Sequence, residues 1–184
     1  MRYLNALVLS ICFALVVSCP LSQAAIQTAI AETSTAELPT ITKTPQISPT
    51  PRISPEIISY ISTMNAQEKS LEDALDKVQS YIDQIGPNTS VILDKNWQTG
   101  IAIALAGVKF NGDALSHADN VPPQLDIADR WFKMAGNEAQ SLADNLSTGI
   151  DNFDTEKMNA SQENAINIAR YLSNANDEMN KVVP

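Results

Sequence analysis

The chain has 184 residues and a formal net charge of −9, with 21 acidic residues against 12 Lys and Arg. This length suits one domain with extensions, and the acidic balance disfavours nucleic-acid binding through a basic patch. With only two cysteines, Cys12 and Cys19, both near the N-terminus, the chain has no disulfide framework for its folded part.

Residues 1–18 have the pattern of a signal peptide. A basic residue, Arg2, begins the segment, and an apolar run with two polar interruptions extends to Val17. The run is shorter than the roughly 20 apolar residues that span a bilayer, so an uncleaved anchor helix is the least favoured interpretation. We therefore expect the protein to be exported.

The stretch Val16-Val17-Ser18-Cys19 has two aliphatic residues and a small residue directly before a cysteine, and it resembles the bacterial lipobox. The resemblance implies that the thiol of Cys19 is acylated, which would anchor the protein to the membrane on its extracytoplasmic face. Ordinary leader cleavage at Ser22-Gln23-Ala24 or Ala29-Ile30-Ala31 is the alternative, and it would give a secreted or periplasmic protein. The sequence favours lipidation of Cys19.

Residues 19–55 are predicted to be a disordered tether rich in Pro, Ser and Thr. A loose six-residue repeat begins at Ile41 and again at Ile47 and Ile53. Proline removes amide donors and pushes the preceding residue toward extended backbone, so a stiffened and solvated spacer is expected. Such a spacer suits a lipid anchor, and a disordered tail on a secreted protein fits the same residues.

Residues 56–184 are predicted to be an all-α, up-down-up-down antiparallel four-helix bundle, with helices at about 56–85, 90–118, 123–149 and 155–182. Apolar residues recur at alternating steps of four and three in each segment, and short connections join the segments. The expected stripes are Ile57, Ile61, Met64, Leu71, Leu75, Val78, Ile82 and Ile85; Trp97, Ile101, Ala104, Val108, Leu115 and Ala118; Leu125, Ala128, Phe132, Ala135, Ala139, Leu142 and Leu146; and Met158, Ala165, Ala169, Leu172, Met179 and Val183.

Two pairings follow from counting along these antiparallel segments. Glu68 interrupts the first stripe at the level of Arg170, which predicts a partly buried ion pair between them. Phe110 in the second segment comes near Trp131 in the third.

Gly100, Gly107 and Ala114, seven residues apart, predict a smooth face for a close helix neighbour or, alternatively, the wall of a cavity.

The search for catalytic, cofactor-binding or metal-ligating residues finds none that we would assign. The single histidine, His117, lies at the expected end of the second segment and is more typical of a helix C-terminus than of a ligand. Paired carboxylates are the one catalytic pattern present, but interleaved lysines favour a solvated face; these residues are Glu72, Asp73, Asp76 and Asp83, with Lys69 and Lys77.

The proline start of the third segment, the turn GIDNFDTEKM and the alanine-spaced fourth segment resemble many small exported bacterial helical proteins without assigned activity. The resemblance implies a compartment and a fold class. We expect a non-enzymatic protein with a binding or structural role in the cell envelope, held to the membrane through its N-terminal lipid, with another envelope protein as a candidate partner. The alternative is an extracytoplasmic carrier of a haem, a metal or a small apolar ligand, bound near Gly100–Gly107. Neither the oligomeric state nor a specific partner follows from these residues.

Overall fold

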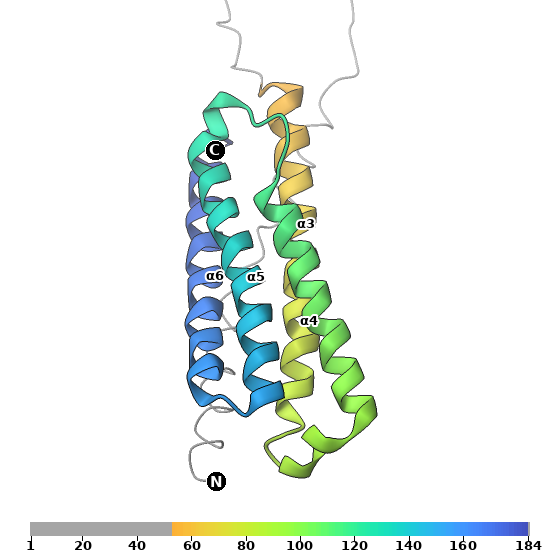
Figure 1. The fold of residues 1–184 in the computed structure, drawn as a ribbon. Helices are drawn as coiled ribbons and strands as arrows, with labels where there is room; N and C mark the ends of the chain where they lie inside the picture. Colours follow the sequence, from red (N-terminus) through yellow and green to blue (C-terminus); the bar gives the residue numbers. More distant parts are fainter. Residues whose placement is uncertain (1–52, 184) are drawn as a thin grey trace, which may run out of the picture.

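The computed structural model describes residues 53–183, and Figure 1 shows four long helices lying side by side, with α3 and α4 forming one pair and α5 and α6 another. In chain order the elements are α3 (Pro55–Asp83), the 3₁₀ helix η1 (Thr89–Leu93), α4 (Lys95–Ser116), the 3₁₀ helix η2 (Pro123–Leu125), α5 (Asp126–Asn152) and α6 (Thr155–Val182). Each long helix contacts the one that follows it, and the α5–α6 contact is the most extensive. The predicted all-α up-down bundle is therefore confirmed. The predicted signal peptide, Cys19 and the predicted tether up to residue 52 lie outside the described residues.

Side chains of Ser and Asp cap the N-termini of three of these helices. The Oγ of Ser54 accepts from the amide of Ile57 at 3.4 Å, with Pro55 in the first turn of α3. Asp94 accepts two amides at the start of α4, and Asp154 accepts two at the start of α6. Each cap satisfies amides that have no partner within the helix, so these residues fix where the helices begin.

The heptad stripes form the core, and most of the expected positions are buried. All seven expected positions of the third stripe, from Leu125 to Leu146, are buried. The fourth stripe differs at two places: Ala169 is exposed while its neighbour Ile168 is buried, and Val183 at the end of the stripe is only half-buried. An α-helix turns slightly less per residue than a strict 3.5-residue repeat requires, so the buried line drifts across the helix surface along its length.

Three helix limits also differ from those expected by three residues or more. The second α-helix begins at Lys95, because η1 occupies residues 89–93 and Asp94 is extended and caps the helix. The third α-helix begins at Asp126, because the 3₁₀ helix η2 occupies Pro123–Leu125. The third helix passes through Gly149 and ends at Asn152, where Phe153 takes the left-handed conformation (φ 53°). Gly149 is buried against α6, since a Cβ there would lie 2.8 Å from Cγ of Met158, so this glycine marks a close contact and not a helix end.

Small residues allow two helices to approach α4 from different sides. Gly100 and Gly107 face α3: a Cβ on Gly100 would meet the ring of Tyr81, and a Cβ on Gly107 would lie 3.8 Å from Cβ of Ala74. These small residues were expected either to contact a neighbouring helix or to line a cavity, and the structure shows that Gly100 and Gly107 contact α3. The helix backbones themselves come close between α4 and α5, where a Cβ on Gly136 would overlap the carbonyl oxygen of Gly112.

The two glycine environments predict opposite effects of the same substitution. Gly136→Ala should destabilise the bundle by on the order of 2 kcal/mol, because the new methyl group meets backbone atoms of α4 that cannot move aside without separating the helices. Gly107→Ala should stabilise it by up to about 1 kcal/mol, because its methyl group has room and alanine favours the helix. Urea unfolding of the two variants measures both changes, and two changes of the same sign would contradict the described packing.

Candidate functional site

The most unusual surface of the described chain is the side of α4 that faces away from the bundle. Ile103 is 69% exposed and Phe110 is 74% exposed, and Ala102 before Ile103 and Ala106 between the two are exposed as well. We call these four residues the α4 outer face. No charged residue occurs between Lys95 and Lys109.

The spacing of the residues along α4 explains why this face is separate from the core. At 3.6 residues per turn, residues 103, 106 and 110 fall on one side of the helix. The core side is made by a different set of buried residues, namely Trp97, Ile101, Ala104, Leu105, Val108, Gly112 and Leu115. The helix is therefore apolar on two opposite sides, and the bundle covers only one of them. A helix that is hydrophobic all round is normally covered all round.

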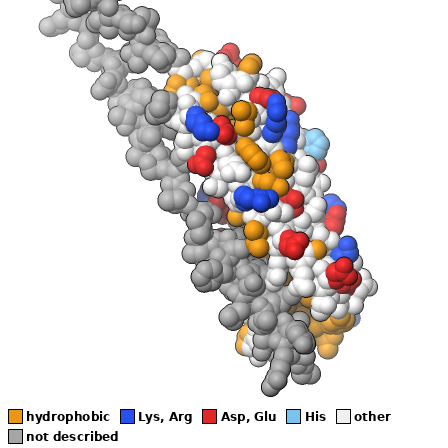
Figure 2. All heavy atoms as spheres, turned by 90° about the vertical axis from the view of Figure 1, so that its left-hand side faces the viewer, with side chains coloured by type: hydrophobic (Ala, Val, Ile, Leu, Met, Phe, Trp, Pro, Cys, Tyr) orange, Lys and Arg blue, Asp and Glu red, His pale blue; other side chains and the backbone are white. Residues whose placement is uncertain are grey.

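Other exposed apolar side chains do not gather in the same way. Those with 40% or more exposure outside α4 are distributed over α3, η1, α5, the α5–α6 connection and α6; they are Ile58, Leu93, Ile127, Met134, Phe153 and Ile166. Figure 2 shows the α5–α6 side of the molecule, where hydrophobic side chains form a short strip among charges of both signs. Single exposed apolar residues are common on soluble proteins, whereas a contiguous uncharged face points to an interaction.

The expected contact between Phe110 and Trp131 is wrong. The ring of Trp131 stacks on Tyr171 of α6, with centroids 5.7 Å apart, while Phe110 lies exposed on α4. Simple counting along antiparallel helices gives the level of a residue along the bundle but not the direction in which its side chain points.

The expected ion pair between Glu68 and Arg170 is also wrong. Nδ2 of Asn176 donates to Oε1 of Glu68 at 2.9 Å, which joins α3 to α6. Arg170 is exposed and donates to Asn167 and to the hydroxyl of its neighbour Tyr171. An uncharged amide in the seam avoids the desolvation of a guanidinium, which remains in water on the outer side of α6.

The carboxyl of Glu68 is unusually easy to protonate. Burial raises its pKa from the usual 4.5 to about 7; the hydrogen bond from Asn176 lowers the pKa in part, and the nearby Glu72 carboxylate raises it further. Oδ1 of Asn176 is buried and has no hydrogen-bond partner among the described residues. When Glu68 is protonated, its O–H group can donate a hydrogen bond to this oxygen, so the neutral carboxylic acid and the amide are complementary.

A second buried polar group connects α3 diagonally to α5. The hydroxyl of Tyr60 donates to Oδ1 of Asp129 at 3.1 Å, and Nζ of Lys133 lies 2.7 Å from Oδ2 of the same carboxylate. Asp129 is only 3% exposed. Burial, together with the charge of Asp129 and the hydrogen bond to it, raises the pKa of Tyr60 above its usual range. Tyr60 therefore stays protonated and donates to the carboxylate. Both groups that contact the carboxylate belong to this chain.

A groove of about 570 Å³ lies beside this group, between the first turns of α3 and the end of α4. His117 is one of its lining residues, together with Tyr60 and Gln67. His117 is the C-cap residue of α4, and its Nδ1 lies 2.9 Å from the carbonyl oxygen of Asp113. The histidine therefore lies where a helix C-terminus was predicted for it.

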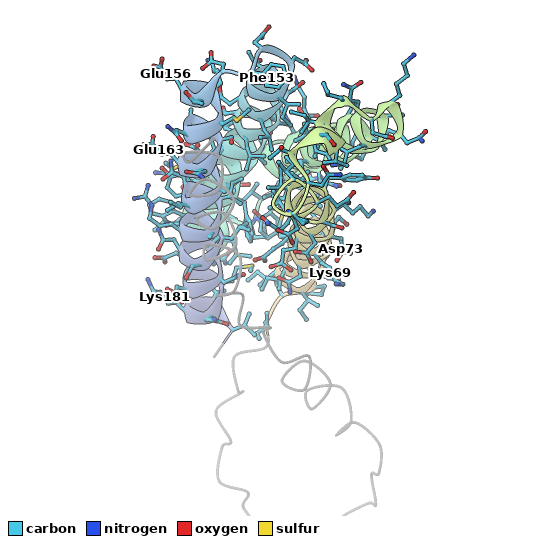
Figure 3. All side chains as sticks on the ribbon, turned by 90° about the horizontal axis from the view of Figure 1, so that it is seen from below. Lys69, Asp73, Phe153, Glu156, Glu163 and Lys181 are labelled. Carbon is cyan, nitrogen blue, oxygen red and sulfur yellow. The ribbon has the colours of Figure 1, made fainter. Side chains whose placement is uncertain are left out.

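The acidic cluster of α3 forms part of its outer surface. Nζ of Lys69 lies 3.4 Å from Oδ1 of Asp73, and both side chains extend from the helix into solvent, as Figure 3 shows. Asp76 and Asp83 are exposed too. In residues 53–183 the structure places no group of three or more His, Cys, Asp and Glu side chains that could hold a metal ion.

A further observation concerns the membrane. Cys19, the predicted lipidation site, lies outside the described residues. None of the helices in that described part combines the length and apolarity that crossing a bilayer requires.

Comparison with known protein families, with curated proteins and with solved structures finds no match to this chain.

The Glu68–Asn176 pair predicts a fall in stability on the alkaline side. Because the folded pKa lies above the unfolded one, the folded state holds the proton more tightly, and the resulting stabilisation is full below about pH 4.5 and lost as the pH rises through 7. Glu68→Gln keeps the shape of the side chain and stays neutral. At pH 8 the free energy of unfolding of this variant should therefore exceed that of the wild type by on the order of 2 kcal/mol. At pH 4 the difference should nearly vanish.

Urea unfolding at the two pH values measures this difference. Glu163→Gln is the matched control, since Glu163 is exposed on α6 (Figure 3) and loses the same charge. A gain for Glu68→Gln that is equal at both pH values would show that protonation of Glu68 plays no part.

Proposed function

We propose that this protein is an exported bacterial protein, anchored by lipid at Cys19, which presents its acidic helical bundle on a tether as a non-catalytic binding module in the cell envelope. The observation that carries the binding role is the α4 outer face, with Ile103 and Phe110 exposed on an uncharged stretch. The proposed partner is a protein, because the exposed groups are apolar side chains on a regular helix that can pack against another helix.

The polar groups of the described residues support a non-catalytic role. Asp129 is 3% exposed, and its two carboxylate oxygens contact Tyr60 and Lys133 of the same chain, so it is not accessible to a substrate. His117 has no second histidine to act with, since it is the only one in the sequence. The acidic composition makes nucleic acid an unsuitable partner.

The alternative role, as a carrier of a haem, metal or small apolar molecule, has weaker support. It places the ligand near Gly100 and Gly107, and both glycines lie against side chains of α3. A carrier role would require α3 to move away from α4 on loading.

The lipid anchor has a direct chemical test. Mass spectrometry of the mature N-terminus should find diacylated or triacylated Cys19, and Cys19→Ser should release the protein from the membrane fraction. Cys12→Ser is the matched control, because Cys12 lies within the proposed leader and should leave anchoring unchanged. A mature N-terminus near Ala25 or Glu32 would instead establish ordinary leader cleavage.

The binding role has a test in the intact cell. A photo-crosslinking amino acid at position 110 of the full chain should capture a protein partner, because the wild-type side chain there is exposed on the α4 outer face. The same group at position 166, an exposed isoleucine of α6, should give a several-fold lower yield. Equal yields at both positions would remove the reason for assigning binding to α4.

A further inference from the structure

We propose that the α4 outer face pairs in antiparallel orientation with the α4 outer face of a second copy of this chain. The two-fold axis passes between the two helices at the level of residue 104. This inference rests on the proposed function, since it names the partner of the same surface. It follows from the apolar residues of that face, from the charges at its two ends and from the net charge of α4.

The charges at the ends of α4 make the face complementary to itself. Lys95 and Asp113 are both exposed and stand eighteen residues apart. Eighteen residues make five turns of an α-helix, so both residues lie on one line along the helix, about 27 Å apart, at the edge of the α4 outer face. A two-fold axis between them brings Lys95 of each copy to Asp113 of the other. A parallel pairing would instead place like charges together at each end.

The apolar residues fit the same register. With the axis near residue 104, Ala102 of one copy comes level with Ala106 of the other, and Ile103 comes close to Ile103 of the second copy. Small residues on facing helices permit close approach, and isoleucine fills the space beside them. Phe110 comes level with the first turns of the second α4, near Thr99, where no charge opposes it.

Two copies of this acidic chain repel each other through most of their surface, but the charge of α4 is not acidic. The whole chain has a net charge of −9, but α4 itself contains two lysines against one acid, Asp113. Lys109 pairs with Asp144 of α5 at 2.7 Å, and Lys95 remains to oppose Asp113 of a second copy. Each of α3, α5 and α6 contains more acidic than basic residues. Two copies can therefore approach through α4 without bringing acidic surfaces together.

Charge exchange in the full chain tests the pairing and its orientation. Two copies with different epitope tags are produced together in the host, with a photo-crosslinking amino acid at position 103. The wild-type pair should give a crosslinked species that contains both tags and only peptides of this chain. Lys95→Asp alone, or Asp113→Lys alone, should lower the yield about tenfold, because both end contacts become repulsive. Both changes agree with the helix dipole. Asp113→Lys also removes the contact of this carboxylate with Nδ1 of His117, at 3.3 Å, so the helix content of each variant is checked by circular dichroism.

Combining the two variants gives the decisive result. When a Lys95→Asp chain meets an Asp113→Lys chain, opposite charges face each other at both ends again, and the yield of the mixed pair should return to the wild-type level. Asp151→Lys, an exposed charge change on α5, is the control and should have no effect. A yield insensitive to either single exchange would overturn the antiparallel pairing. Adducts with a different protein only would overturn self-pairing and leave the proposed binding role standing, and no adduct with any protein would overturn both.

Discussion

The fold depends on one constraint, which is that each of four helices carries an apolar stripe that must be removed from water. Burying a leucine or isoleucine side chain is worth about 1.5–3 kcal/mol, so the fully buried residues of these stripes dominate the favourable side of folding. The stripes decide which side of each helix faces inward, and the polar caps decide where each helix begins. The close crossing of α4 and α5 at Gly112 and Gly136 then draws two of the helices together. α4 differs from the other three helices because its second apolar side has no counterpart within the bundle.

Polar groups inside the bundle follow the cost of burying charge. Asp129 is buried with a tyrosine and a lysine as partners, and Glu68 is paired with a neutral amide. The difference is physically reasonable, because an ionised carboxylate needs close positive charge or several donors, whereas a protonated one needs only a complementary amide. This places a group with a pKa of about 7 in the seam between α3 and α6, where these helices approach each other less closely than consecutive helices do.

Much of the fold could be predicted from the sequence, because heptad periodicity, proline and Asp or Ser caps act locally. The third stripe was predicted completely, because all of its positions are buried. The partner of Glu68 could not be found by counting, since the choice between Arg170 and Asn176 depends on side-chain direction and on desolvation. The Gly112–Gly136 crossing was missed because it joins residues of two helices through their backbones. The α4 outer face left a readable signal, namely Ile103 and Phe110 seven residues apart on the side opposite the predicted stripe. A stripe of buried positions describes only one side of a helix, so the predicted stripe does not include this face.

The proposed binding role requires that the outer side of α4 is exposed in the purified protein and covered in intact cells. Radical footprinting followed by mass spectrometry measures the solvent exposure of individual side chains in both settings. Ile103 and Phe110 should be labelled strongly in dilute purified protein and several-fold less in intact cells, while Ile166 should be labelled equally in both. Equal labelling of Ile103 and Phe110 in the two settings would contradict the proposed binding role.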